Sequence, residues 1–402
     1  MEKNNMNTKH GLPEKVIFCK RCLMSNQRPS SSPELRKTSS DIKTAGFSDD
    51  GICDACNYYD FKKKMDWEDR EKQLKDLCDK FRRNDGRYDV VVPGSGGKDS
   101  IAVSHLLKYK YNMNPLTVTW APHIYTDVGW RNMQNWLKAG FDNILVTPNP
   151  KVHAILTRLS FENLVNPFQP FIIGQRNIAP RIAAQHDIQF VMYGENQAEA
   201  HNSFNENMSP LMGVEHFSRE SLDDELFFGG ISMKDLPNHG VPLNELNPYL
   251  PILKENFIKK EIEVHYMSYY INWSPQANYY YAKEHANFES NPDGRSEGTY
   301  SKYASIDDRL DGQHYFTMYA KFGQGRTMND ANRDIRDGFI SREEGLALMN
   351  KYDGEFPQKY FQETLDYMGI TEERYWEVID NSRSPHLWKK IGGKWTLLHP
   401  TC

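Results

Sequence analysis

Residues 88–100 have the sequence YDVVVPGSGGKDS, which joins an apolar run to a glycine-rich turn. Residues 88–94 form a short apolar run ending in Pro-Gly, which predicts a buried strand, and residues 101–111 predict a helix. The start of a helix presents unpaired backbone N–H groups and partial positive charge, which suit a phosphate group. Gly96 and Gly97 let the backbone approach a ligand closely. The stretch therefore predicts a phosphate-binding turn between a strand and a helix.

The side chains of this turn add further candidate ligand groups. Ser95 and Ser100 supply hydroxyl donors, and Lys98 supplies positive charge. Asp99 is acidic beside the expected phosphate, so we expect it to reach Mg²⁺ or backbone N–H groups instead. A Walker loop or a dinucleotide fingerprint starting at Gly94 requires glycine at position 99. That position is Asp99, so both motifs are excluded. A glycine-rich turn without any ligand is the alternative.

Strands and helices alternate along the middle of the chain. This alternation is typical of an α/β fold in which helices cover both faces of a parallel sheet. Residues 201–250 are rich in Asn, Pro and Gly and predict an insertion loop. After about residue 290 the pattern changes to short helices. The remaining predictions are strands at 115–120, 143–150 and 188–196, helices at 61–84, 129–141 and 169–187, and a candidate strand at 261–273.

Two Cys-x-x-Cys pairs lie near the N-terminus. Cys19 with Cys22 and Cys53 with Cys56 are separated by a polar stretch rich in Ser and Pro, which has little to bury. Two such pairs can form a closed tetrahedral zinc site, and the metal would supply folding energy to such a segment. An iron–sulfur cluster and the absence of any metal are the alternatives. Cys78 lies within a predicted helix and is expected to be a structural thiol.

Two other strand ends carry candidate nucleotide-binding residues. Thr119 and Trp120 end the predicted second strand, and Gly194 and Glu195 follow the fourth. Ligands of open α/β sheets bind at the carboxyl ends of strands, so these four residues are candidates for an adenine-nucleotide pocket. The alternatives are a tryptophan packed in the core and a simple turn.

Two cations flank a glycine-rich turn in the C-terminal part. Lys321 and Arg326 enclose Gly323 and Gly325, and paired cations around glycine suit a phosphate or a carboxylate. A solvated helical face with surface ion pairs is the alternative.

Composition excludes several classes of protein. The formal net charge of −5 disfavours a pervasive basic surface for nucleic acid or for an anionic membrane. The sequence has no apolar run near the roughly 18 residues that a membrane span needs, and the N-terminus lacks the apolar region of a secretory signal. We therefore expect a cytoplasmic protein.

The Ser-Gly-Gly-x-Asp-Ser pattern at residues 95–100 resembles the pyrophosphate-binding loop of the ATP pyrophosphatases. Within that superfamily the chain resembles the N-acetyl sugar amidotransferase family, and the similarity covers nearly the whole chain. The stretches that carry it include CKRCLMSNQRPS, CDACNYY, VTWAPHIYTDVGWRN, YGENQAE, EGTYSKYASIDDRLDGQHYFTMYAKFGQGR and SREEGLALMNKYDGEFP. The resemblance implies an adenine nucleotide α-hydrolase-like fold that binds ATP through Gly94, Ser95, Gly96, Gly97, Lys98, Asp99, Ser100, Thr119, Trp120, Gly194 and Glu195.

The resemblance also implies a reaction. The family is associated with bacterial lipopolysaccharide and flagellar sugars, including pseudaminic and legionaminic acids. ATP with Mg²⁺ would adenylate the acetamido oxygen of such a sugar, pyrophosphate would leave, and ammonia would displace AMP to give an acetamidino group. Asp99, Lys98, Lys321 and Arg326 are the expected catalytic residues.

A separate partner is expected to supply the ammonia. Residue 2 is Glu, so the chain has no N-terminal cysteine nucleophile, and no Gly-x-Cys-x-Gly pattern surrounds Cys78. The resemblance implies a glutamine-hydrolysing subunit of the histidine-biosynthesis type. The other expected partner is the acetamido sugar, with no nucleic acid and no membrane.

Three regions are expected: residues 1–85 as a zinc-binding module and helix, 86–290 as the ATP-binding domain, and 291–402 as a helical region for substrate or partner. Two alternative functions are a tRNA-modifying thiolase with the same loop and a zinc-stapled scaffold that binds a nucleotide. A tRNA enzyme would need a basic RNA-binding face, which the net acidity disfavours.

Overall fold

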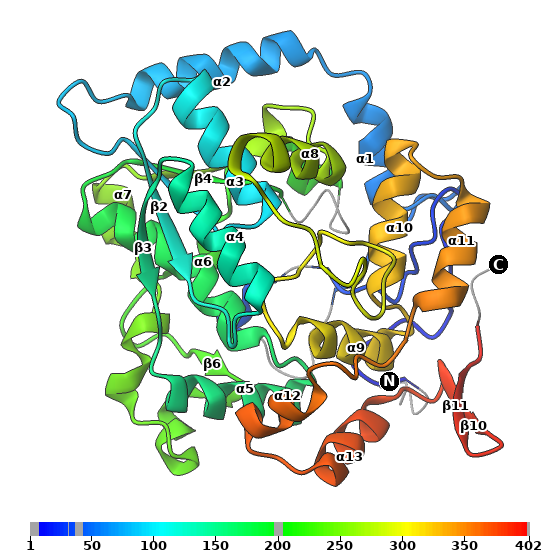
Figure 1. Cartoon of the computed structure of the whole chain (residues 1–402). Helices are drawn as coiled ribbons and strands as arrows, with labels where there is room; N and C mark the ends of the chain where they lie inside the picture. Colours follow the sequence, from blue (N-terminus) through cyan, green and yellow to red (C-terminus); the bar gives the residue numbers. More distant parts are fainter. Residues whose placement is uncertain (1–7, 31, 37–42, 197–203, 400–402) are drawn as a thin grey trace.

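A five-stranded parallel sheet forms the core of the α/β part of the molecule, on the left in Figure 1. The structure is a computed structural model that describes residues 8–30, 32–36, 43–196 and 204–399. It confirms the predicted α/β fold, with strand ends shifted by a few residues, and the candidate strand at 261–273 is confirmed only in its first half. In spatial order the strands are β3 (Asp142–Val146), β2 (Pro115–Trp120), β1 (Val90–Pro93), β4 (Phe190–Tyr193) and β9 (Glu263–Tyr266).

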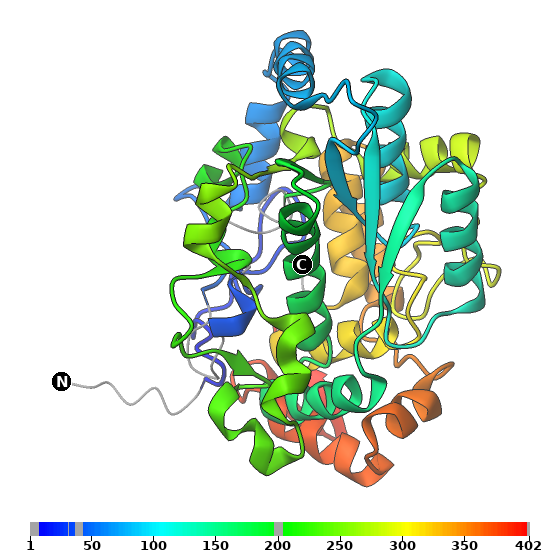
Figure 2. The same cartoon turned by 90° about the vertical axis from the view of Figure 1, so that its left-hand side faces the viewer.

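Helices cover both faces of this sheet. Val91 of β1 belongs to a core cluster with α5 and α6, whereas Val90 and Val92 pack with α2 and α3 on the opposite face. This follows from the alternation of side chains along a strand. Figure 2 shows α6 on one side of the strands and α4 on the other. The helices are α2 (Trp67–Phe81), α3 (Lys98–His105) with a π-helical turn η2 (Leu106–Lys110), α4 (Asp127–Lys138), α5 (Pro150–Leu164), α6 (Gln169–Gln185) and α8 (Pro275–Ala286).

Two helix predictions differ from the structure. The predicted helix at 61–84 is wrong as a single element, because α1 (Asp54–Lys62) ends before Asp66, whose side chain accepts hydrogen bonds from the N–H groups of Glu68 and Asp69 and starts α2. Helix α5 is not among the predicted helices. Asn149, which caps it, and proline in its first turn are the signals that mark its start.

The predicted insertion loop at 201–250 contains short ordered elements where the structure describes it. Phe217, Phe228 and Leu246 from this segment pack into the core cluster of α5 and α6. The segment therefore packs against one face of the sheet and is not a loop exposed to solvent. Its elements, with the short helices elsewhere, are η4 (Phe204–Met208), η5 (Val214–His216), β5 (Ser218–Arg219), β6 (Phe227–Phe228), β7 (Ile231–Ser232), η6 (Met233–His239), η7 (Leu243–Tyr249), β8 (Ile252–Leu253), α7 (Lys254–Lys259), η1 (Glu34–Arg36) and η8 (Met267–Tyr269).

The N-terminal segment packs on the C-terminal helices, although the two are far apart in the sequence (Figure 1). Leu23 lies in a core cluster with Met328 and Met349, and its N–H donates a hydrogen bond to Asn332 Oδ1 at 2.7 Å. The predicted helical character of the C-terminal region is confirmed. Its elements are α9 (Asp311–Phe322), α10 (Arg326–Asp337), α11 (Arg342–Tyr352), α12 (Phe361–Met368), α13 (Glu372–Ser382) and the hairpin of β10 (Trp388–Ile391) and β11 (Lys394–Leu397).

Among the helices in the described part of the chain, none combines the length and the apolar character that crossing a bilayer requires.

Candidate active site at the carboxyl edge of the sheet

The turn between β1 and α3 lies where the strand order reverses. β1 has the next strand in sequence, β2, on one side and the later strand β4 on the other. Open α/β sheets bind ligands outside the carboxyl ends of strands at such a point. Residues 94–100 line a cavity of about 670 Å³ there. The structure therefore brings the whole predicted phosphate-binding turn to the wall of this cavity.

The glycines of this turn are required by close packing. Gly96 has φ +79°, and a Cβ at this position would lie 2.7 Å from the Cα of Met133 in α4. A Cβ at Gly94 would collide with the side chain of Ser100 in α3. The turn is thus pressed between two helices, and its conformation excludes other residues at position 96.

The side chains of the turn form a local charged network. Lys98 is buried, and its Nζ lies 2.6 Å from Oδ2 of Asp99, whose Oδ1 accepts a hydrogen bond from Asn278 in α8 at 2.9 Å. The Ser100 hydroxyl donates to the carbonyl of Gly97 at 3.0 Å, which closes the start of the helix. Lys98 is therefore positioned by the protein and does not extend into solvent.

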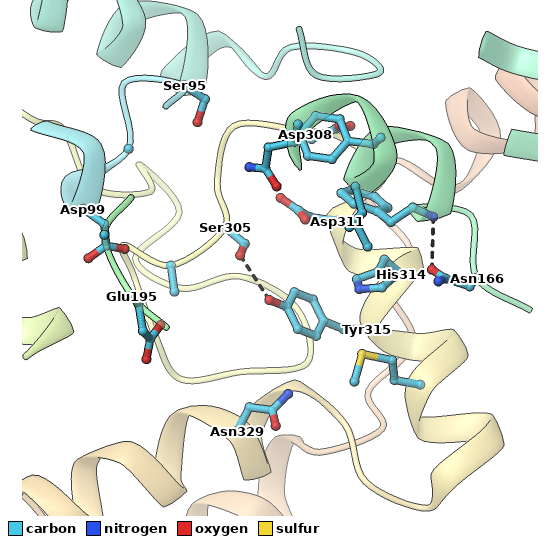
Figure 3. A pocket seen from close by; sticks show the side chains of 18 of the residues that line it. Ser95, Asp99, Asn166, Glu195, Ser305, Asp308, Asp311, His314, Tyr315 and Asn329 are labelled. Atoms are coloured by element: carbon cyan, nitrogen blue, oxygen red, sulfur yellow. Dashed lines mark hydrogen bonds between the residues drawn. The ribbon is translucent and has the colours of Figure 1, made fainter. Parts of the chain in front are cut away.

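Three carboxyl groups from around the start of α9 face the same cavity. Asp307, Asp308 and Asp311 all line it (Figure 3). Burial, reinforced by the neighbouring Asp307 and Asp308, raises the pKa of Asp311 well above its usual value. Asp308 is held by His123, whose Nδ1 lies 2.7 Å from Oδ2. The cavity can therefore hold a proton or a cation beside the turn. None of the three is among the predicted site residues, although the Asp307–Asp308 segment is unusual in sequence, and nothing local in the sequence reveals the burial of Asp311.

An ion pair joins the end of β4 to the C-terminal helices. Glu195 Oε2 lies 2.8 Å from Nη2 of Arg333 in α10, and both residues line the cavity together with Gly194. Burial disfavours the charged guanidinium, but Glu195, Asp330 and Asp99 outweigh it and raise the pKa of Arg333. Helix α10, which lies more than a hundred residues later in the sequence, therefore contributes to the predicted nucleotide-binding end of β4.

Thr119 and Trp120 do not line the cavity. The Trp120 side chain is buried against α6, where a Cβ on Gly174 would collide with its ring, and it packs on Tyr249 at 5.2 Å between ring centroids. The Thr119 hydroxyl accepts a hydrogen bond from Asn143 Nδ2 at 3.0 Å. The side chains at the end of β2 thus belong to the core, which is the alternative that the sequence left open for Trp120.

The structure separates Lys321 from Arg326. Lys321 lines the cavity, and its Nζ donates to the carbonyl of Leu164 at 2.7 Å. Arg326 does not line the cavity. Its Nη2 donates to the carbonyls of Ala304 and Ser305, and its guanidinium lies 4.8 Å from the ring of Tyr315. Both cations are buried, so a solvated face is wrong for this segment, and Arg326 holds a loop that lines the site.

Cavity residues lie at two ends (Figure 3). Ser95, Asp99 and Glu195 lie at one end, His314 and Asn166 lie at the other, and Tyr315 lies between them with its hydroxyl 3.2 Å from Ser305 Oγ. One end therefore contains residues of the glycine-rich turn, and the other contains residues of α9 and of the loop between α5 and α6.

The four predicted cysteine ligands converge in the N-terminal segment. The Sγ atoms of Cys19, Cys22, Cys53 and Cys56 are buried and lie within 4.8 Å of one another, with Cys19 and Cys56 at 3.9 Å and Cys22 and Cys53 at 3.7 Å. A tetrahedral zinc ion with Zn–S bonds of about 2.3 Å places its sulfurs about 3.8 Å apart. The spacing fits one such ion better than a cluster of several irons, which requires sulfurs further apart.

Backbone N–H groups point at these sulfurs. The N–H groups of Arg21 and Met24 approach the sulfurs of Cys19 and Cys22, both at 3.4 Å. Donors in this position stabilise the thiolate form that binds metal.

Comparisons with known proteins cover parts of the chain. Residues 297–400 match the family model described as LPS biosynthesis protein WbpG-like, C-terminal domain. An uncharacterized protein, MJ1599 of Methanocaldococcus jannaschii, is 31% identical over 81 residues, which are 20% of this chain and 29% of that protein, so the chain spans less than a third of this relative's length. A structure of NMN synthetase from Francisella tularensis aligns at 15% identity and a TM-score of 0.24, covering 49% of this chain and 85% of the other. The C-terminal helices that line the cavity thus lie within the segment that is similar to a lipopolysaccharide-biosynthesis domain.

Proposed function

We propose that this chain is an ATP-dependent amidotransferase of surface-polysaccharide biosynthesis. In the proposed reaction it adenylates the acetamido group of a sugar and replaces the oxygen with ammonia, giving an acetamidino group, AMP and pyrophosphate. The observation that carries the proposal is one shared cavity. The glycine-rich turn after β1 and the helices of the WbpG-like segment line it together.

The turn is suited to the phosphates of ATP. Backbone N–H groups at the start of α3 and the buried Lys98 supply donors for a pyrophosphate leaving group. The partly exposed carboxylate of Asp99 is a candidate ligand for the Mg²⁺ that accompanies ATP. An amide is a poor electrophile, and adenylation converts its oxygen into a leaving group, so holding pyrophosphate in this turn favours the first step.

The acids around α9 are suited to the second step. Ammonia adds to the adenylated carbon, its nitrogen must lose a proton, and the C–O bond to AMP then breaks to give the amidine. A carboxylate with a raised pKa is a stronger base for that proton than an ordinary one. Asp307, which lines the cavity, has a pKa raised by burial and by Asp308, although a hydrogen bond from Ser95 opposes the change. We assign proton acceptance in this step to the carboxyl group of Asp307.

A direct assay tests the proposal. The protein is incubated with ATP, Mg²⁺, ammonium and a panel of acetamido sugars, and the products are read by mass spectrometry. We expect a product lighter than its sugar by the difference between an oxygen atom and an NH group, with AMP and pyrophosphate in equal amounts. Release of ADP and phosphate would contradict the proposal, and ATP cleavage stimulated by tRNA would favour the thiolase alternative.

Replacing Asp99 with Asn is expected to lower kcat/KM for ATP by about 100-fold, because the substitution removes the charge facing Lys98 and the candidate Mg²⁺ ligand. The measurement is pyrophosphate release at several Mg²⁺ concentrations. The matched control is Asp127→Asn, because the Asp127 side chain is 88% exposed and lies outside the cavity. Equal activity of both variants would remove Asp99 from the site.

We also propose that a glutamine-hydrolysing partner supplies the ammonia. The isolated chain is then expected to use ammonium salts but not glutamine, and its rate at fixed total ammonium should rise with pH as neutral ammonia becomes more abundant. The rate of amidine formation is measured with ammonium and with glutamine as the nitrogen source, each at several pH values. Glutamine-dependent activity of the chain alone would show that no partner is needed.

A further inference from the structure

The cavity contains a half-buried arginine that has no carboxylate partner among the described residues. Arg28 lines the cavity from the N-terminal segment, and its Nε and Nη1 atoms are shielded from solvent without a hydrogen-bond acceptor in the described structure. Two other cavity arginines have acceptors, since Arg333 contacts Glu195 and Arg176 donates to the carbonyl of Ser32 at 3.2 Å. The Nε and Nη1 donors of Arg28 are therefore unmet in a side chain that lines the cavity.

The backbone around Arg28 holds the residue in place. Its N–H donates to the carbonyl of Ser25 at 3.1 Å, and its carbonyl accepts from the N–H of Ala45 at 2.8 Å. Arg28 also lies six residues after Cys22, so the four-cysteine site anchors the segment that carries it. The guanidinium is thus built into the cavity wall.

The surroundings of Arg28 leave its charge uncompensated. Burial lowers the pKa of Arg28 to about 10, so the guanidinium remains charged near neutral pH. Tyr315 and Asp353 favour the charged form and Arg333 opposes it. The Asp353 carboxylate is already engaged, because it accepts from the N–H groups of Gly325 at 2.8 Å and Met328 at 3.2 Å. A buried cation without a partner costs folding free energy, which an incoming anion would offset.

We propose that Arg28 forms a subsite for an anionic group of the sugar substrate, either a carboxylate or a phosphate, beside the ATP-binding turn. The inference rests on the proposed function, because that function identifies the ligand as a sugar. The nucleotide phosphates have their own donors in the turn and in Lys98, so Arg28 is assigned to the second molecule. A guanidinium suits both anions because its planar donors match their oxygens.

Binding to the full chain tests the subsite without requiring turnover. Three acetamido sugars are titrated by calorimetry in the presence of Mg²⁺ and α,β-methylene ATP, which cannot release pyrophosphate. The probes are N-acetylneuraminic acid with a carboxylate, UDP-N-acetylglucosamine with a diphosphate, and neutral N-acetylglucosamine. We expect one charged sugar to bind about 10- to 100-fold more tightly than the neutral sugar, and the charged sugar that does so identifies the anion.

Substitution of Arg28 assigns that preference to the subsite. R28Q is expected to remove the preference while leaving the affinity for the ATP analogue unchanged, and R28K is expected to keep part of it. R28Q should also keep or raise the melting temperature, because it removes a buried cation without a partner. The matched control is R219Q, since Arg219 has a buried Nε without an acceptor in the described residues but lies outside the cavity.

Four results would overturn the subsite. The charged-sugar preference could survive in R28Q, or it could be absent in the native chain. An equal loss of affinity for the ATP analogue in R28Q would assign Arg28 to the nucleotide. A lower melting temperature of R28Q would make Arg28 a structural residue. A retained charge preference without any amidine product would instead refute the proposed reaction while leaving the subsite intact.

Discussion

Replacing Gly96 with alanine is expected to reduce ATP turnover by about 100-fold, the scale of loss when reacting groups are misplaced by about 1 Å. Gly96 has φ +79°, which costs an alanine about 1–2 kcal/mol. The added Cβ would also lie 2.7 Å from the Met133 Cα and 2.8 Å from its backbone nitrogen. The atoms of α4 at this contact belong to the backbone and cannot rotate away as a side chain could. The turn itself must therefore move. Pyrophosphate release measures the loss, and thermal unfolding measures the cost in stability.

The control for this variant separates backbone strain from collision. Gly369 at the end of α12 has φ +64°, but a Cβ there meets no atom within 4 Å. Gly369→Ala should therefore lose about 1–2 kcal/mol of stability and keep its turnover. If Gly96→Ala retained turnover within a few-fold of the native chain, the turn would not be the phosphate-binding element.

Replacing Cys22 with serine is expected to abolish metal binding and to give the largest loss of stability among these variants. Cys22 is buried, with its sulfur 3.7 Å from that of Cys53. Structural zinc supplies apparent binding free energies on the order of 10 kcal/mol or more, and its loss should release the segment that carries Leu23 and Arg28. Elemental analysis should find about one zinc ion per native chain and almost none in the variant. A lower melting temperature and reduced turnover should accompany this loss.

Cys78 provides the control for that experiment. It is as buried as Cys22, but it packs with Leu74 and Val90 against the sheet, away from the four sulfurs. Burial raises the pKa of its thiol to about 12, so it stays protonated. Cys78→Ala should cost about 1 kcal/mol and keep the full zinc content. A native chain free of zinc and iron, with Cys22→Ser unchanged in stability, would exclude a metal-binding role for the cluster.

The candidate site shows where local pattern is informative and where it is not. The turn at residues 94–100 was predictable because each residue serves a local requirement, such as positive φ at Gly96 or a free N–H at a helix start. Trp120 and Arg326 were not predictable in the same way. Their neighbours in sequence resemble those of site residues, yet the tertiary packing places Trp120 against α6 and turns Arg326 towards the carbonyls of a loop.

The residues that the sequence did not reveal share one property. Asp311 and Arg28 are ordinary charged residues in polar stretches, and only their position in a common cavity makes them unusual. Glu195 and Arg333 pair across 138 positions of the chain. No local pattern encodes such a pairing.

The alternation of strands and helices, the glycine-rich turn after a strand and the pairing of cysteines could all be predicted from the sequence, because they depend on residue types within a few positions of one another. Only the tertiary structure decided which charges enter the cavity and that the N-terminal segment forms part of its wall. The physical reason is that burial and charge pairing are set by contacts between distant segments, and those contacts exist only after the chain has folded.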